Sequence, residues 1–180
     1  MDGDGDLDIV SASYDDDTIA WYENQGSRPS LSINDVTASN ENAANATFTA
    51  TLSAASSEVI TVAYASSNGT ATAGADYTAS SGTLTFAAGT TTQTFTVPVL
   101  ADSTDEANET ATLTLSNASN ASISDATGTL TITDDDAAPS LSINDVTTSN
   151  ENAANATFTA TLSAASGQQV TVDYASSNGT

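Results

Sequence analysis

Residues 30–56 read SLSINDVTASNENAANATFTATLSAAS, and residues 140–166 repeat them as SLSINDVTTSNENAANATFTATLSAAS. The two copies differ at only one of these 27 positions, Ala38 against Thr148, and they lie 110 residues apart. This spacing is too long for a solenoid repeat and is about the length of one small β-sandwich domain. The sequence therefore predicts a tandem repeat, in which residues 29–138 form a complete domain and residues 139–180 form a truncated second copy.

The composition excludes several classes of function. The chain has 180 residues, with 23 acidic side chains against one basic side chain, Arg28, and a formal charge of −22. Such a surface repels nucleic acids and attracts cations. The chain contains neither Cys nor His, which excludes disulfides, zinc sites built from thiolates or imidazoles, and Ser-His catalysis. We expect no enzymatic activity, and no apolar run approaches the ~20 residues of a transmembrane helix.

Alternation of polar and apolar residues predicts seven strands in the complete domain. They fall at residues 31–36, 46–53, 59–65, 83–86, 92–100, 110–116 and 128–133. One face of each strand is apolar, as at Phe48, Ala50 and Leu52, while the other face is often Thr-rich. This pattern predicts an all-β fold, a seven-stranded antiparallel immunoglobulin-like β-sandwich. Pro98 cannot donate a ladder hydrogen bond, so we expect either that its strand lies at a sheet edge or that Pro98 lies on the unpaired side of its strand.

The acidic residues of the domain are expected to gather at one end. Successive connections of an antiparallel sandwich alternate between its two ends. This rule places ten of the twelve acids at one end, leaving Glu58 and Asp125 at the other. The ten are Asp35, Glu41, Asp76, Asp102, Asp105, Glu106, Glu109, Asp134, Asp135 and Asp136. Crowded carboxylates repel one another unless they are protonated or bridged by a cation, and many oxygen ligands favour calcium over magnesium. The two interpretations are a calcium site and a solvated acidic loop end.

Five motifs add a family resemblance. They are SLSINDVT at residues 30–37, TATAGADYT at 70–78, VLADSTDEANET at 99–110, TLTLSNAS at 112–119 and GTLTITDDD at 128–136. Together with Glu41 they resemble a Calx-beta domain across residues 29–136. The resemblance implies bound Ca²⁺ and a structural role for Glu109. It implies these ligands: Glu41, Asp76, Asp102, Glu106, Asp134, Asp135 and Asp136. Ala101 stands where the family has an Asp, which leaves the number of ions open.

Residues 1–28 form a separate segment. Two short strands are expected at residues 6–13 and 18–26, preceded by the acidic run DGDGDLD at residues 2–8. This run resembles the calcium loop of FG-GAP/VCBS propeller repeats, and the resemblance implies an N-terminal propeller-blade fragment. Asp2, Asp4 and Asp8 match the family's liganding positions and form a weaker candidate metal site. A solvated acidic N-terminus is the alternative interpretation.

The combined prediction is a calcium-binding structural or adhesive module of a large secreted or cell-surface protein of the bacterial type. Ca²⁺ at the acidic end would rigidify the junction to the next module through residues 137–139. One alternative is a calcium-independent acidic spacer, and another is an appendage of a glycan-binding propeller that uses Trp21. The expected partners are neighbouring modules of the same polypeptide, with other cell-surface proteins or glycans as further candidates. The expected location is extracellular or at the cell surface.

Overall fold

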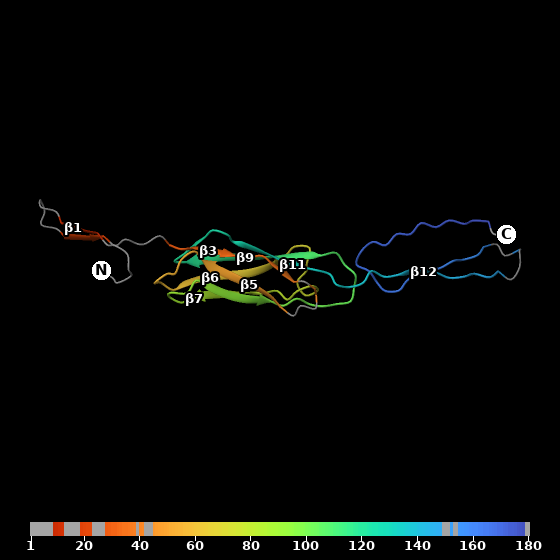
Figure 1. The fold of residues 1–180 in the computed structure, drawn as a ribbon, viewed down its shortest axis with the longest axis horizontal. Helices are drawn as coiled ribbons and strands as arrows, with labels where there is room; N and C mark the ends of the chain where they lie inside the picture. The colour runs from red at the N-terminus through yellow and green to blue at the C-terminus, as the bar shows by residue number, and fades with distance from the viewer. Residues whose placement is uncertain are drawn as a thin grey trace.

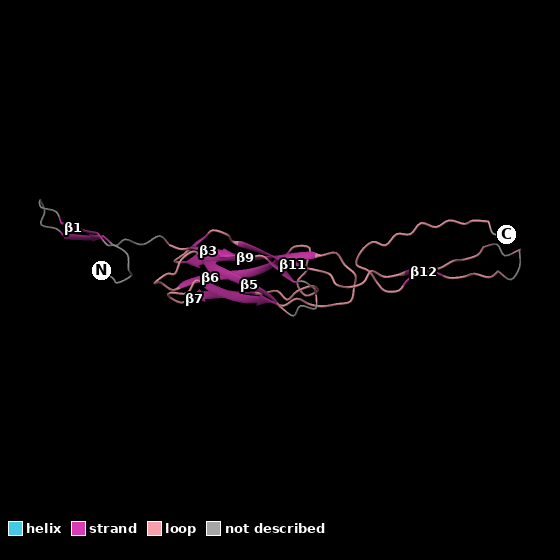
Figure 2. Cartoon of the chain, viewed as in Figure 1, coloured by secondary structure: helices cyan, strands magenta, loops and turns pink. Residues whose placement is uncertain are grey.

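The computed structural model describes residues 9–12, 19–22, 28–38, 40–41, 45–148, 152 and 155–178. These residues form strands and loops, and no helix occurs among them (Figure 1 and Figure 2). Near the N-terminus, β1 (Ile9–Ala12) pairs antiparallel with β2 (Ile19–Tyr22). Near the C-terminus, β12 (Leu141–Ile143) pairs antiparallel with β13 (Ala160–Leu162). Within these described ranges, no helix has the length and apolar character needed to cross a membrane.

The β-sandwich lies between these two strand pairs. Its strands are β3 (Ser30–Ile33), β4 (Val36–Ala38), β5 (Ala46–Leu52), β6 (Ile60–Asn68), β7 (Ser81–Phe86), β8 (Thr92–Val97), β9 (Glu109–Ser119), β10 (Ser122–Ile123) and β11 (Thr127–Ile132). One sheet has the order β10-β3-β5-β8, and the other has the order β4-β11-β9-β6-β7. Adjacent strands run antiparallel except for the short pairs β10–β3 and β4–β11. The predicted all-β sandwich is confirmed.

The inner faces of the two sheets form one apolar core. In β5, Phe48 and Leu52 are buried while Thr47 and Thr51 are exposed, as the alternation predicted. The Phe95 ring from β8 stacks on Phe48 with a centroid distance of 5.5 Å. β8 is an edge strand, which is one of the two placements expected from Pro98. Burying a large apolar side chain contributes roughly 1.5–3 kcal/mol, so this core holds the two sheets and the loops between them in place.

The first predicted strand, residues 31–36, differs from the structure. It is divided into β3, which lies in one sheet, and β4, which lies in the other. At the crossing, Asn34 Oδ1 accepts a hydrogen bond from the Thr49 N–H at 2.6 Å. A Cβ atom at Gly128 would lie 2.5 Å from the Asn34 carbonyl oxygen, so the crossing depends on the missing side chain of this glycine. The alternation pattern could not predict the crossing because β3 and β4 both keep the period of a strand.

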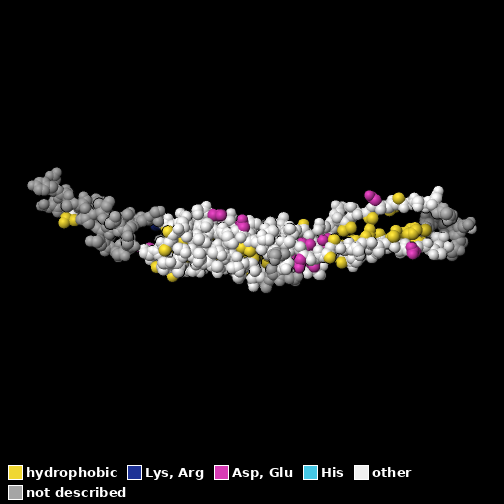
Figure 3. All heavy atoms as spheres, in the orientation of Figure 1, with side chains coloured by type: hydrophobic (Ala, Val, Ile, Leu, Met, Phe, Trp, Pro, Cys, Tyr) yellow, Lys and Arg dark blue, Asp and Glu magenta, His cyan; other side chains and the backbone are white. Residues whose placement is uncertain are grey.

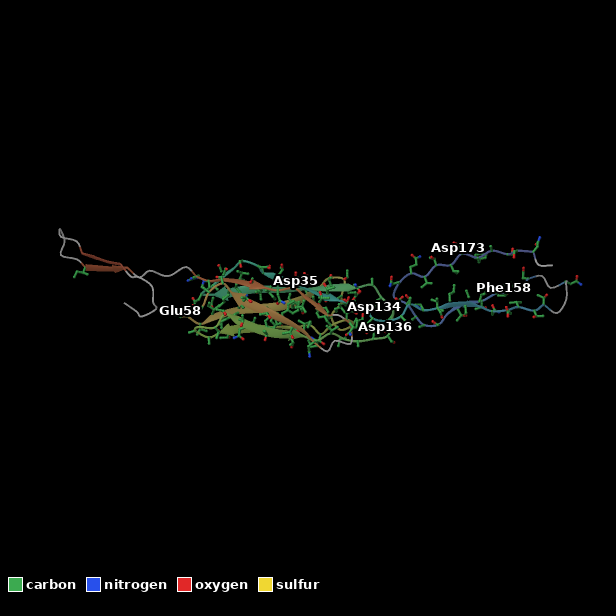
Figure 4. All side chains as sticks on the ribbon, viewed as in Figure 1. Asp35, Glu58, Asp134, Asp136, Phe158 and Asp173 are labelled. Carbon is green, nitrogen blue, oxygen red and sulfur yellow. The ribbon has the colours of Figure 1, made fainter. Side chains whose placement is uncertain are left out.

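Two further differences follow from local geometry. Asn120 has a left-handed φ of 57°, and the reversal there is followed by β10, which was not predicted. Asp35, predicted at the acidic end, lies instead at the β3–β4 crossing. Its Oδ1 accepts a hydrogen bond from the N–H of Thr129, inside β11, at 2.7 Å. Figure 4 shows Asp35 well away from Asp134 and Asp136. The prediction for Asp35 was therefore wrong.

The sequence repeat is also a structural repeat over one strand pair. Leu141 pairs with Leu162 in β12–β13, as Leu31 pairs with Leu52 in β3–β5. The surroundings of these pairs differ, however. Phe158 is 57% exposed, whereas its counterpart Phe48 is fully buried. Apolar side chains of this second strand pair are visible as a yellow row in Figure 3.

Candidate metal centre

The end of the sandwich that faces the β12–β13 pair carries carboxylates from four separate segments. These are the loop after β4, the connection from β6 to β7, the connection from β8 to β9, and the residues after β11. Figure 3 shows acidic side chains at this end of the sandwich, and Figure 4 places Glu58 at the opposite end. Two groups of acids have carboxylate oxygens within 4.8 Å of one another.

The first group, the Glu41 cluster, consists of Glu41, Asp134 and Asp136. Parallel pairing of β4 with β11 brings the segments after these two strands together. A hydrogen bond from the Thr133 N–H to the Ala38 carbonyl, at 3.1 Å, extends this pairing to the cluster. The backbone N–H of Glu41 then donates to Asp135 Oδ1 at 3.3 Å. The fold of β4 and β11 thus sets the position of the cluster.

Two buried oxygens of the Glu41 cluster lack a hydrogen-bond partner. Among the described residues these atoms are Asp134 Oδ1 and Asp136 Oδ2. The backbone of Asp134 is held in place, because its N–H donates to Asn108 Oδ1 at 3.1 Å. A buried polar atom without a partner costs about 1–3 kcal/mol, more if it is charged. These oxygens therefore need a ligand that supplies positive charge or protons.

The second group, the Asp76 cluster, consists of Asp76, Glu106 and Glu109. Tyr77, fully buried, anchors the connection that carries Asp76, and its hydroxyl donates to Asn68 Oδ1 at 2.8 Å. Asp76 Oδ2 accepts a hydrogen bond from the Thr72 N–H at 2.6 Å. Its backbone carbonyl accepts the Leu100 N–H at 2.9 Å, which joins this connection to the loop that carries Glu106.

Two of the predicted ligands flank these clusters. Asp102 is exposed, and its Oδ1 accepts the Thr104 N–H at 2.6 Å, which closes a turn in the β8–β9 connection. Its charge acts on both clusters, because it raises the pKa values of Glu41 and Glu106. Asp135 is exposed and accepts the hydrogen bond from Glu41. Both residues therefore lie beside the clusters and add to their negative charge.

Four carboxyl groups of this end have raised pKa values. Burial, followed by the charges of Asp102 and Asp134, raises the pKa of Glu41 from 4.5 to about 7. Burial and a hydrogen bond with Asp76 raise the pKa of Glu109 to about 7. The pKa values of Glu106 and Asp136 are also raised, first by burial and then by neighbouring carboxylates. Two carboxylates 4.8 Å apart repel by about 3 kcal/mol at an effective dielectric constant of about 20.

The structure brings together nine of the ten acids predicted for this end, all except Asp35. Five of the seven predicted ligands, Glu41, Asp76, Glu106, Asp134 and Asp136, have oxygens within the two clusters. Glu109 lies in the Asp76 cluster although it was expected to be structural. Its position in the sequence, close to the other acids of the β8–β9 connection, could have indicated a ligand. The family resemblance instead implied a structural role. Asp2, Asp4 and Asp8 lie outside the described residues.

The donor set selects the chemistry. Six carboxylates in two adjacent clusters offer only hard oxygen ligands, and the chain has no Cys or His to bind a softer metal. Its single basic residue, Arg28, precedes β3 at the opposite end of the sandwich. Calcium takes six to eight oxygen ligands in flexible geometry, whereas magnesium demands an octahedron and keeps much of its water. The site is therefore suited to calcium.

Comparisons with known families and with solved structures agree on one family. Residues 25–136 match the Calx-beta domain. The crystal structure of the apo-form Calx CBD1 domain is similar with a TM-score of 0.57 and 25% identity, over 61% of this chain and 100% of that chain. The calcium binding domain CBD12 of CALX1.1 is similar with a TM-score of 0.56 and 27% identity, over 64% of this chain. The chain spans 50% of that protein's chain. A search of curated protein sequences found no match.

Proposed function

Because the chain belongs to the Calx-beta family over residues 25–136, we propose that the acidic end of its sandwich binds calcium. The observation that carries this proposal is the pair of buried carboxylate oxygens, Asp134 Oδ1 and Asp136 Oδ2, that have no hydrogen-bond partner among the described residues. A bound cation would provide the missing interaction and would offset the mutual repulsion of the clusters. One of the similar proteins, CBD12 of CALX1.1, is itself a calcium binding domain, which supports the same ion.

Each of the two clusters would contribute carboxylate ligands to bound calcium. Glu41, Asp134 and Asp136 would hold one ion, with Asp135 and Asp102 beside them. Asp76, Glu106 and Glu109 would hold a second ion or extend the first site. Glu106 raises the pKa of Glu41, so the two clusters are electrostatically coupled. A cation bound at one cluster would therefore stabilise the deprotonated carboxylates of the other cluster.

The proposed role of the ion is structural. The aspartates after β11 lead directly into residues 137–139, which connect the sandwich to the β12–β13 pair. Calcium bridging these aspartates to Glu41 would fix the direction in which the chain leaves the domain. We place this module in a secreted or cell-surface protein in which residues 139–180 begin a second Calx-beta copy and residues 1–28 are part of an FG-GAP/VCBS repeat. Neighbouring modules of the same polypeptide are its proposed partners, with adhesion as the wider role.

Calorimetric titration of the full chain with calcium tests the metal site. Asp134→Asn and Asp136→Asn keep side-chain size and remove a charge from the Glu41 cluster, so each is expected to weaken calcium binding by tenfold or more. Glu58→Gln is the matched control, because Glu58 is exposed at the opposite end. Calcium affinity that is unchanged in both Asn variants would contradict the proposed site. No measurable calcium binding by the parent chain would favour the calcium-independent acidic spacer.

The glycan-binding alternative needs a separate assay. A glycan array probed with the full chain and with Trp21→Ala would detect binding through the N-terminal segment. Binding that is lost in this variant would support the propeller appendage, and it would not affect the calcium site in residues 29–138.

A further inference from the structure

The turn after β13 contacts the connection between β8 and β9 of the sandwich. Ser166 Oγ donates a hydrogen bond to Asp105 Oδ2 at 2.9 Å, and the Gly167 N–H donates to the Asp105 carbonyl at 2.9 Å. Gln168 Nε2 donates to the Glu106 carbonyl at 3.1 Å. Asp105 and Ser166 also form an isolated parallel bridge. The turn at residues 166–168 therefore donates to both backbone and side-chain acceptors of the acidic end.

The two sequence copies differ at this turn and match closely again after it. They are identical at 26 of 27 positions up to Ser56 and Ser166, and then Ser57-Glu58-Val59 in the first copy stands against Gly167-Gln168-Gln169 in the second. The turn itself has the same hydrogen bond in both copies. The Glu58 N–H donates to Ser56 Oγ at 3.0 Å, and the Gln168 N–H donates to Ser166 Oγ at 3.1 Å. The copies thus share a backbone turn and differ in the residues that it presents.

The missing side chain at Gly167 allows the close approach. A Cβ atom at this position would lie 2.8 Å from Glu106 Oε1 and 2.9 Å from Glu106 Cγ. The serine of the first copy would therefore require the Glu106 side chain to shift. Gly167 is exposed and its φ is not left-handed, so the contact with Glu106 is the feature that favours a glycine here.

The amide at Gln168 supplies the donor and avoids a charge. Its Nε2 group is the atom that contacts the Glu106 carbonyl. The glutamate of the first copy would replace this donor with an acceptor and would add a negative charge beside Asp105 and Glu106. Both effects oppose the contact, since an acceptor cannot bond to a carbonyl and like charges repel.

We propose that Gly167 and Gln168 form a docking turn that recognises the acidic end of a preceding module of this fold. The partner is the β8–β9 connection at Asp105 and Glu106. Ser57 and Glu58, the counterparts in the first copy, would dock more weakly on such an end. The order of the two copies along the chain is therefore encoded at these two positions. The acceptors of this contact are Asp105 Oδ2 and the backbone carbonyls of Asp105 and Glu106, and none of them is a carboxylate oxygen of the two clusters, so the contact can be tested in chelator.

Distance measurement between two spin labels tests this proposal in the full chain. The chain has no Cys, so labels at Thr85→Cys in β7 and Thr161→Cys in β13 are specific, and both positions are exposed. In chelator the parent chain is expected to give a narrow distance distribution. Gly167→Ser combined with Gln168→Glu is expected to broaden it, with a roughly tenfold fall in the ratio of docked to undocked chains from the lost hydrogen bond and added repulsion.

Two controls keep the result specific. The reverse exchange, Ser57→Gly with Glu58→Gln, alters the equivalent turn at the opposite end and is expected to leave the distribution narrow. Adding Asp105→Asn to Gln168→Glu removes the opposing charge and is expected to restore part of the docked population. An unchanged distribution in the Gly167→Ser/Gln168→Glu chain, or a broad one in the parent, would overturn the docking turn. Neither outcome depends on calcium.

Discussion

Replacing Glu41 with Gln is expected to change stability in opposite directions without and with calcium. Glu41 is 9% exposed, and burial together with nearby carboxylates raises its pKa from 4.5 to about 7. A rise of this size means that its charged form costs the folded state about 3 kcal/mol. Glu41→Gln removes this charge and nearly preserves the shape. In chelator at pH 8 it is expected to raise the free energy of unfolding by about 1–3 kcal/mol.

The same substitution removes a proposed calcium ligand. With saturating calcium, Glu41→Gln is expected to be less stable than the parent chain, because the gain from the ion shrinks when one carboxylate is lost. Urea unfolding at pH 8, in chelator and in calcium, measures both effects. Glu58→Gln is the matched control and is expected to stay within about 0.5 kcal/mol of the parent in both conditions. If Glu41→Gln destabilised the chelated protein, the repulsion assigned to this cluster would be wrong.

Three further predictions concern pH and packing. In chelator the free energy of unfolding is expected to fall as the pH rises from about 4.5 to 7. The raised pKa values of Glu41 and Glu109 make the folded state bind more protons than the unfolded state in that window. Urea unfolding at pH 5 and pH 8 measures this change, and a rise in the free energy of unfolding across the window would contradict it. Phe48→Ala is expected to cost about 3–5 kcal/mol, whereas Phe158→Ala, at the exposed equivalent in the second copy, is expected to change stability by less than about 0.5 kcal/mol; equal losses in thermal melts would refute the difference in burial. Gly128→Ala is expected to cost about 1–3 kcal/mol because its Cβ would overlap the Asn34 carbonyl, and a stability equal to that of the parent would show that the strand crossing tolerates a side chain.

Most of the fold could be predicted because the alternation of apolar and polar residues along each strand matches the alternation of buried and exposed side chains. Residues such as Phe48 and Leu52 face the core because a strand turns successive side chains to opposite faces. The division of the first strand could not be predicted in this way. It depends on a contact between Asn34 and Gly128, which are 94 positions apart in sequence. The error at Asp35 has the same origin, since that residue lies in the crossing between β3 and β4 rather than at the end of the sandwich.

The candidate site could be predicted as a region but not as two clusters. Alternation of the connections brings acids such as Glu41 and Asp134 to one end. Their grouping depends on pairing beyond the strands, such as the bond from Thr133 to Ala38. Glu109 joins the Asp76 cluster because β9 begins at this residue. Loop geometry of this kind is not encoded in the spacing of the acids.

Thermal unfolding of the full chain in calcium, in magnesium and in chelator tests the central claim most directly. If calcium binds only the folded domain, a hundredfold excess over the dissociation constant stabilises it by about 2.7 kcal/mol. That gain corresponds to a rise in Tm of roughly 10 °C for a domain of this size. The calcium-binding account predicts this rise with calcium and a much smaller one with magnesium. Superimposable melting curves in all three conditions would contradict it and would leave an acidic spacer that binds no calcium.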